Sequence, residues 1–271
     1  MNTVVANGVT HHVQRLPAKG HTGAAPAPTA VLVHGLLTDS LASYYFTLGP
    51  AFAAAGFDVI MYDLRGHGRS TRPSTGYRLA DFVADLDALL DALDVQHPVH
   101  LVGNSFGGTI AFGYAERRPE RAASIAFIES TPATPAWAAQ MAVTLATCQD
   151  QLPRPEAIAW IADHRGAHTA RLSEGAGRLL LSSSIAEDIP ASEVLSDARI
   201  AAVAVPILAI YGGAAELVGQ ADWLGSLLPS CTTVVLPEQQ HWVLVQSTAL
   251  CGELICEWLR EHSGLLAPGP R

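Results

Sequence analysis

A single serine stands between two glycines in the stretch LVGNSFGG, residues 101–108. Ser105 lies between Gly103 and Gly107, which gives the pattern G-x-S-x-G. Where this pattern joins a strand to a helix, the turn has no room for flanking side chains, and the serine hydroxyl is exposed at the end of the strand. VHLV before it is typical of a strand, and GGTIAFGYAERR after it is typical of a helix. The stretch therefore predicts a nucleophilic serine, with a glycine-rich packing turn as the alternative.

A serine hydroxyl is a weak nucleophile until a base takes its proton, so a histidine is required. Folds with this turn order the triad as serine, acid and histidine, which places the histidine late in the chain. Of eleven histidines, His241 fits best because it follows the apolar stretch CTTVVLP and precedes the helical stretch LCGELICEWLRE. The alternative is a surface histidine at a loop-to-helix junction. His164 and His168 are four residues apart, but Gly166 between them argues against a metal pair, and we expect no cofactor.

Attack by the serine places negative charge on a substrate oxygen, which needs hydrogen-bond donors already in position. Two backbone N–H groups are candidates for this oxyanion hole. The N–H of Phe106 lies at the amino end of the helix after the serine, where amides have no partner within the helix. The N–H of Leu36 follows the strand that ends in LVHG, and we expect His34-Gly35 to turn the chain toward the same point. We interpret His34 as a structural hydrogen-bonding residue beneath the site.

The elements that hold these groups alternate between short apolar runs and longer segments with helical spacing. Apolar residues recur three or four positions apart over 79–95, which predicts a helix, and 48–56 is a further candidate. Strands are expected over 30–35, 56–64, 99–105, 122–130, 206–213 and 231–237. Apolar strands separated by helices indicate an α/β class, with a mostly parallel sheet covered by helices on both faces and ligands bound at the carboxyl ends of the strands.

Residues 131–200 depart from this alternation. They contain the helical stretches TPATPAWAAQMAVTL and PEAIAWIADHRGAHTARL and the loop-like stretch SSSIAEDIPAS, with no evident strand. We interpret the segment as a helical cap, or lid, inserted after the sixth strand. Residues 1–130 and 201–271 then form the core domain.

Four large apolar side chains are candidates to line a substrate pocket. Three lie in the expected cap, and the fourth follows the expected catalytic histidine: Trp137, Met141, Trp160 and Trp242. A cavity lined by aromatic and aliphatic side chains suits an apolar ligand. The alternative is that these residues pack the cap onto the sheet, since aromatic side chains usually serve a core.

The composition of the chain narrows its class. The 271 residues are 49% hydrophobic and 15% charged, enough for a sizeable core. A net charge of −9 without a basic cluster argues against nucleic acid as a partner. The four cysteines show no metal or disulfide pattern. No apolar run reaches the roughly 18 residues of a membrane span, and no signal peptide is evident. We expect a cytoplasmic protein with a small-molecule substrate and no membrane partner; its oligomeric state is open.

Together these stretches resemble the α/β-hydrolase superfamily, most closely its branch of small capped hydrolases. The resemblance is carried by VLVHGL, YDLRGHGRS and LVGNSFGG, and it covers about 28–130 well and 206–259 less fully. It implies a Ser-His-acid triad, a nucleophile elbow around the serine, an oxyanion hole and a lid. Dehalogenases and epoxide hydrolases of this branch use aspartate as the nucleophile, so Ser105 favours acyl transfer instead.

The resemblance also assigns roles within YDLRGHGRS, residues 62–70. In the family this segment is structural scaffolding near the site. The residues of this chain that match the motif are Asp63, Gly66, Gly68 and Ser70, with His67 as a turn residue.

The acid of the triad departs from the family pattern. The family usually places an aspartate just after the seventh strand, where this chain reads YGGAAEL. Glu216, one residue beyond the expected place, is one candidate. Glu129 is the other, because some dehalogenase-like members carry the acid at the end of the sixth strand. Glu129 is favoured, since a glutamate at the buried end of a strand is costly unless it is paired. A different acid, or none, is the third alternative.

The predicted function is that of a serine hydrolase. It would cleave an ester, thioester or carbon–carbon bond of a small apolar or aromatic acyl substrate through an acyl-enzyme. The irregular acid raises an alternative on the same fold: a repurposed cyclase, lyase or product-releasing enzyme of a biosynthetic pathway. A binding protein on a retired hydrolase scaffold is a third candidate, disfavoured by the intact Ser105 and His241.

Overall fold

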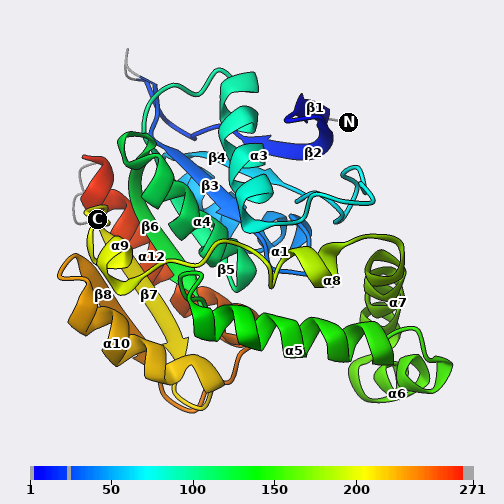
Figure 1. Ribbon diagram of the computed structural model, residues 1–271. Coiled ribbons are helices and arrows are strands. Elements are labelled where there is room, and N and C mark those ends of the chain that lie inside the picture. Colours follow the sequence, from blue (N-terminus) through cyan, green and yellow to red (C-terminus); the bar gives the residue numbers. More distant parts are fainter. Residues whose placement is uncertain (1–2, 23–25, 265–271) are drawn as a thin grey trace.

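The computed structural model describes residues 3–22 and 26–264 (Figure 1). Its centre is one sheet with the strand order β1-β2-β4-β3-β5-β6-β7-β8. The strands are β1 (Thr3–Ala6), β2 (Val9–Leu16), β3 (Thr29–Val33), β4 (Asp58–Tyr62), β5 (Val99–Asn104), β6 (Ala122–Ile128), β7 (Ile207–Gly212) and β8 (Cys231–Leu236). From β4 to β8 every neighbouring pair is parallel. The six strands expected from sequence are confirmed, and the carboxyl ends of the parallel strands share one edge.

The antiparallel edge β1–β2 was not expected. Ala6 pairs with Val9, so Asn7 and Gly8 form a two-residue turn, and both have positive φ, 47° and 74°. An Asn-Gly turn of this kind matches the twist of a hairpin. The strand β2 then pairs antiparallel with β4 and extends the sheet.

Helices cover both faces of the sheet, and successive strand residues alternate between the two cores. In β3, Val31 and Val33 join the core under α3 (Leu79–Ala92), α4 (Phe106–Arg117) and α10 (Gly219–Leu227). Ala30 and Leu32 join the core under α1 (Ala42–Tyr45), α2 (Leu48–Ala54), α11 (Val243–Gln246) and α12 (Thr248–Ser263). The α/β fold class predicted from sequence is confirmed.

Five helices lie between β6 and β7, within the segment that the sequence sets apart. They are α5 (Pro135–Gln151), α6 (Pro155–Arg165), α7 (Ala167–Ser182), α8 (Ile185–Asp188) and α9 (Asp197–Ala201). The stretch 155–172 is helical as expected, and Gly166, with φ 87°, divides it between α6 and α7. The short α8 occupies a stretch expected to be loop.

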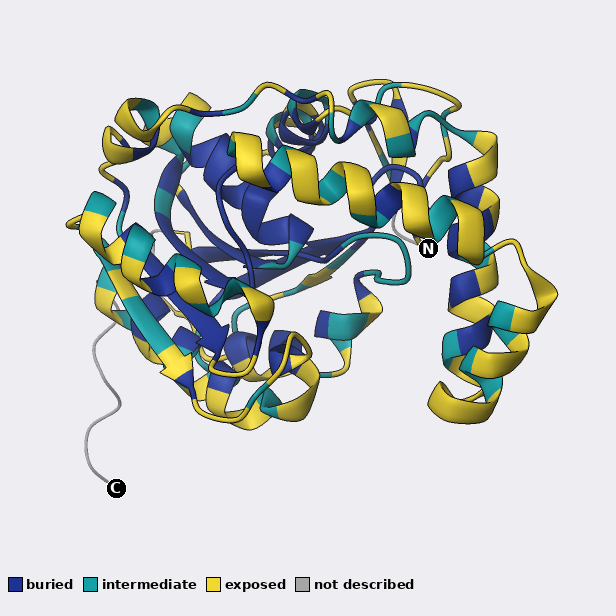
Figure 2. Cartoon of the chain, turned by 60° about the horizontal axis from the view of Figure 1, so that its bottom comes forward, coloured by how far each residue is buried: buried dark blue, intermediate teal, exposed yellow. Residues whose placement is uncertain are grey.

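The long helix α5 carries the α6–α7 pair at its far end (Figure 1). Figure 2 shows the sheet buried between its helices and much of the α6–α7 pair exposed. Helix α6 contains no buried residue. Among the helices of the described residues, none combines the length and apolarity needed to cross a bilayer.

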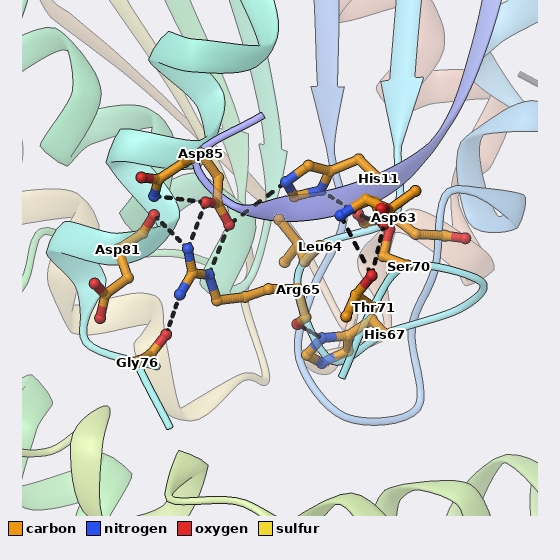
Figure 3. Close-up of polar contacts among 12 residues, drawn as sticks. His11, Asp63, Leu64, Arg65, His67, Ser70, Thr71, Gly76, Asp81 and Asp85 are labelled. Carbon is orange, nitrogen blue, oxygen red and sulfur yellow. Dashed lines mark hydrogen bonds and ion pairs between the residues drawn. The ribbon is translucent and has the colours of Figure 1, made fainter. Parts of the chain in front are cut away.

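The turn after β4 has the scaffolding role that the family motif implies (Figure 3). The Asp63 carboxylate accepts hydrogen bonds from the N–H of Leu41 at 2.9 Å and of Arg69 at 2.8 Å. The Ser70 hydroxyl donates to the Asp63 carbonyl at 2.6 Å. Gly68 has φ 48°, and a Cβ there would overlap the Asp63 carboxylate. This turn lies against the loop that follows β3.

Candidate active site

The expected turn around Ser105 is present between β5 and α4. Ser105 has φ 51° and ψ −122°, a conformation that costs energy for a residue with a side chain. A Cβ on Gly103 would overlap the backbone of Gly107 and Gly108, and a Cβ on Gly107 would overlap the Val33 carbonyl. Glycine is therefore required on both sides of the serine, and Ser105 stays partly exposed at the strand end.

Glu129 leaves the sheet beside the serine. The strands β5 and β6 pair with Asn104 opposite Ile128, and the Ser105 N–H donates to the Ile128 carbonyl at 2.9 Å. Glu129 has φ 50°, so the chain turns sharply as β6 ends. The side chain of Glu129 is fully buried, and one carboxylate oxygen accepts a hydrogen bond from the Gly212 N–H. This buried charge therefore has a fixed backbone partner, as burial requires.

The other carboxylate oxygen of Glu129 meets His241. The distance from Oε2 to Nδ1 of His241 is 3.1 Å. Because a carboxylate only accepts, the Nδ1 atom carries the proton, and the lone pair of Nε2 is left to act as a base. The His241 side chain is 50% exposed, so the ring is open to an incoming ligand while its partner stays buried.

The loop before His241 is held across the end of β7. The Gly213 N–H donates to the Leu236 carbonyl at 2.8 Å, and the Ala214 N–H donates to the Gln239 carbonyl at 2.9 Å. A Cβ on Gly212 would overlap the Gln239 carbonyl. Gly212 therefore lets the loop cross the strand end at the position that brings His241 to Glu129.

Glu216, the other acid candidate, lies elsewhere. It begins the 3₁₀-helix η2 (Glu216–Val218), is exposed, and forms no hydrogen bond with His241 in the described part of the chain. The structure thus brings Glu129, and not Glu216, to the histidine.

The loop after β3 leaves the Leu36 amide available. The Gly35 N–H donates to Asp39 at 2.6 Å, and the Leu37 N–H donates to His67 at 2.9 Å. Between them, the Leu36 N–H forms no hydrogen bond within residues 3–22 and 26–264. The Phe106 N–H, at the first position of α4, has no acceptor in the same described ranges. The Leu36 and Phe106 amides, which the sequence predicts as oxyanion donors, are therefore both free to bind an oxyanion.

The four expected pocket residues are not all brought together. Trp137 is buried and stacks parallel on Phe106, with ring centroids 6.4 Å apart, and Met141 is partly buried on the same core. Trp242 is 55% exposed and meets His241 edge to face, with centroids 6.5 Å apart.

Trp160 lies apart from this group. It is 55% exposed and stacks on His164 of the same helix, with centroids 4.3 Å apart. Its helix, α6, packs on α7 at the far end of α5, which explains why Trp160 does not reach the residues around Ser105.

The chain that leaves Glu129 is tied to the core before it enters α5. The Tyr211 hydroxyl donates to the Ser130 carbonyl at 2.8 Å, and the Thr109 hydroxyl donates to the Thr131 carbonyl at 2.9 Å. The Thr131 hydroxyl in turn donates to Gln220 at 3.0 Å. Residues 130–131 therefore form an anchored link between Glu129 and helix α5.

Sequence reasoning missed two parts of this site. It did not find Gly212 as the donor to Glu129, although the paired glycines after β7 signal a close approach of backbone. It also did not find Asp39, which takes the Gly35 N–H and leaves Leu36 as the free amide; no residue pattern around Asp39 indicates this role.

Comparison with known proteins places this chain in a family. The model of the alpha/beta hydrolase fold family matches residues 28–247. The chain belongs to this family. The prediction of an α/β-hydrolase-type enzyme is thus confirmed at the level of the family.

The relatives of this α/β-hydrolase carry different names. A haloalkane dehalogenase from Mesorhizobium japonicum is 41% identical over 105 residues, 39% of this chain and 33% of that protein. The chain matches only about a third of the length of the first curated relatives, 29% and 33%.

Two solved structures share the fold over nearly their whole length. A meta-cleavage product hydrolase from Pseudomonas fluorescens aligns with a TM-score of 0.73 at 20% identity, covering 96% of this chain and 98% of its own. An enol-lactonase from Burkholderia xenovorans aligns with a TM-score of 0.73 at 21% identity, covering 95% and 99%. At such identities the likeness concerns the fold alone.

Proposed function

We propose that this α/β-hydrolase is a serine hydrolase that cleaves an ester, thioester or carbon–carbon bond through an acyl-enzyme. One observation carries the proposal: the buried Glu129 carboxylate bonds Nδ1 of His241 beside the strained turn that exposes Ser105. A fully buried carboxylate after β6, a half-exposed imidazole in the loop after β8 and a partly exposed hydroxyl after β5 supply the groups that acyl transfer uses.

In the first half-reaction, Oγ of Ser105 attacks the substrate carbonyl carbon while Nε2 of His241 takes the hydroxyl proton. The carbonyl π electrons move onto oxygen, and the N–H groups of Leu36 and Phe106 bind that oxyanion. Glu129 stabilises the imidazolium through Nδ1. The tetrahedral intermediate then expels the leaving group, which takes the proton from Nε2, and the acyl group remains on Ser105.

In the second half-reaction, His241 removes a proton from water, and the resulting hydroxide attacks the acyl carbon. The second tetrahedral intermediate expels Oγ of Ser105, which recovers its proton from Nε2. The products are a carboxylic acid and the enzyme in its starting state, so water is the only co-reactant.

The side chains around Ser105 support an apolar or aromatic acyl group. Trp137 stacks on Phe106, and Trp242 is half-exposed beside His241. Trp242 would gain free energy by burying its exposed surface against an apolar ligand, whereas Trp137 and Phe106 are already buried.

The cyclase or lyase alternative drew its support from the unusual position of the acid. The contact between Glu129 and His241 supports an ordinary triad despite that position, so no specific observation favours the alternative over hydrolysis.

The test is covalent labelling followed by turnover. A fluorophosphonate probe should add one label to the wild type and to Ser226→Ala, which removes an exposed serine of α10, and none to Ser105→Ala. The wild type should also hydrolyse p-nitrophenyl esters, with aromatic acyl groups preferred over acetyl. Labelling of Ser105→Ala, or a wild type that neither labels nor turns over, would contradict the proposal.

A further inference from the structure

Two buried imidazoles lie side by side beneath the loop that offers the Leu36 amide. The rings of His34 and His67 have centroids 5.4 Å apart, and both residues are at most 2% exposed. Nδ1 of His34 lies 2.7 Å from the Gly35 carbonyl, and Nε2 of His67 lies 2.9 Å from the Leu37 N–H. The two rings therefore hold the backbone on either side of Leu36.

The remaining ring nitrogens fix the proton on each imidazole. The Leu64 N–H donates to Nε2 of His34 at 3.0 Å, so the proton of that ring is on Nδ1. Nδ1 of His67 lies 2.8 Å from the Arg65 carbonyl, which can only accept, so Nδ1 of His67 is also the protonated nitrogen. Burial lowers the pKa of His67 to about 3, which keeps the ring neutral and its Nε2 an acceptor.

These contacts act on the two peptide groups that flank Leu36. The Gly35 carbonyl and the Leu36 N–H belong to one planar trans peptide, so they point in opposite directions. A donor fixed on the carbonyl therefore aims the N–H. His67 fixes the next peptide through the Leu37 N–H, and Leu37 itself has φ 62°, a conformation that a side-chain-bearing residue keeps only when it is held.

We propose that His34 and His67 are positioning residues that aim the Leu36 N–H at the developing oxyanion. His34 acts as a donor to the Gly35 carbonyl, and His67 acts as an acceptor for the Leu37 N–H. The inference rests on the proposed serine hydrolase function, and it extends that function from the reacting groups to the scaffold that orients them.

The asymmetry of the two roles allows a crossed experiment with asparagine and glutamine. The Asn side chain places its amide near the position of Nδ1, and the Gln side chain places its amide near that of Nε2. His34→Asn keeps the donor to Gly35, whereas His34→Gln keeps only the acceptor for Leu64. At the other ring, His67→Gln keeps the acceptor for Leu37, whereas His67→Asn keeps only the donor to Arg65.

The expected pattern is crossed in kcat for p-nitrophenyl ester hydrolysis. His34→Asn and His67→Gln should stay within about fivefold of the wild type, while His34→Gln and His67→Asn should lose about 10- to 100-fold, since removing an oxyanion donor costs 10²–10³ and these variants misalign one. KM should change little, because the oxyanion forms after binding.

Thermal unfolding provides the control, because each of the four variants loses one buried hydrogen bond. A merely structural role predicts losses of kcat that follow the melting temperature, without crossing between positions. Equal kcat for Asn and Gln at both positions, or effects confined to KM, would overturn the inference. The Asn and Gln variants at His34 and those at His67 are two independent pairs. Either pair tests the inference if a variant of the other pair fails to fold.

The same experiment separates this inference from the proposed function. A wild type without turnover or Ser105 labelling contradicts the function itself. An active, labelled wild type whose variants lack the crossed pattern contradicts only the positioning roles of His34 and His67.

Discussion

Replacement of Glu129 by glutamine is the sharpest perturbation of the proposed mechanism. In the wild type both carboxylate oxygens accept, one from the Gly212 N–H and one from Nδ1 of His241. A glutamine has one acceptor and one donor. If its oxygen stays on Gly212, its NH₂ group faces Nδ1, and the histidine must move its proton to Nε2, where it can no longer act as a base. The reverse orientation sets the NH₂ group against the Gly212 N–H.

The size of the effect follows from the 3.1 Å contact between Glu129 and His241. A carboxylate and an imidazolium at that distance attract by about 5 kcal/mol at an effective dielectric constant of about 20. At about 1.4 kcal/mol for each tenfold change in rate, this corresponds to about 10⁴ in kcat. Because His241 is half-exposed and water screens part of the attraction, we expect Glu129→Gln to lower kcat by about 10³–10⁴.

The assay is steady-state hydrolysis of a p-nitrophenyl ester, with Glu216→Gln as the matched control. Glu216 is exposed on η2, so its variant should keep kcat within about twofold of the wild type. The thermal midpoint of each variant checks that the fold is retained. A Glu129→Gln enzyme with near wild-type kcat, or a larger loss in Glu216→Gln, would refute the assignment of the acid.

Three further perturbations follow from the packing. Gly212→Ala should lower kcat about 100-fold while the folded fraction of the protein stays unchanged, because a Cβ there displaces the loop at Gln239 and with it His241. Normal turnover would show that Gly212 does not set the position of this loop. Burial lowers the pKa of His67 to about 3 and of His100 to about 4, so the unfolded chain binds more protons below its ordinary histidine pKa of about 6.5. The free energy of unfolding, measured in urea, should therefore be highest above pH 6.5 and fall toward pH 4. His100→Asn should reduce the slope of this free energy against pH by about 1.4 kcal/mol per pH unit, and an unchanged slope would count against a neutral, buried His100. Arg65 and Asp85 form a buried bidentate pair (Figure 3), with Nε to Oδ2 at 2.7 Å, so Arg65→Met should cost about 3–5 kcal/mol in urea unfolding, and adding Asp85→Leu should recover most of it. A double variant no more stable than Arg65→Met would disagree with this account.

The sheet and the turn around Ser105 could be predicted from sequence because local residue patterns determine them. Apolar runs bounded by turn residues mark the six parallel-core strands, and the glycines at 103 and 107 have no room for side chains. The β1–β2 hairpin carries an equally local signal, the Asn-Gly pair at 7 and 8.

The helices between β6 and β7 were predicted less well because their geometry depends on tertiary packing. Helical spacing indicated that 155–172 is helical, but the break at Gly166 is a backbone turn within an otherwise continuous pattern. Trp160 shows the same limit, since an apolar residue in a helical stretch does not reveal which face its helix presents.

The acid could be narrowed to two residues but not assigned from sequence. Glu129 and Glu216 both follow core strands, and the distance from each to His241 depends on how the loop at 237–240 crosses the end of β7. That path is set by Gly212 and by hydrogen bonds between distant backbone groups, none of which is visible in a linear pattern.

The anchored link at residues 130–131 separates two tasks that a single chain must perform. Glu129 is the residue immediately before it, and helices α5 to α9, which lie between β6 and β7, begin just after it. Because Tyr211 and Thr109 hold this short stretch to the core, a shift or replacement of helices α5 to α9 would leave Glu129 in place against His241. Selection for a new substrate can therefore rebuild the helices above the site while the chemistry beneath is inherited intact.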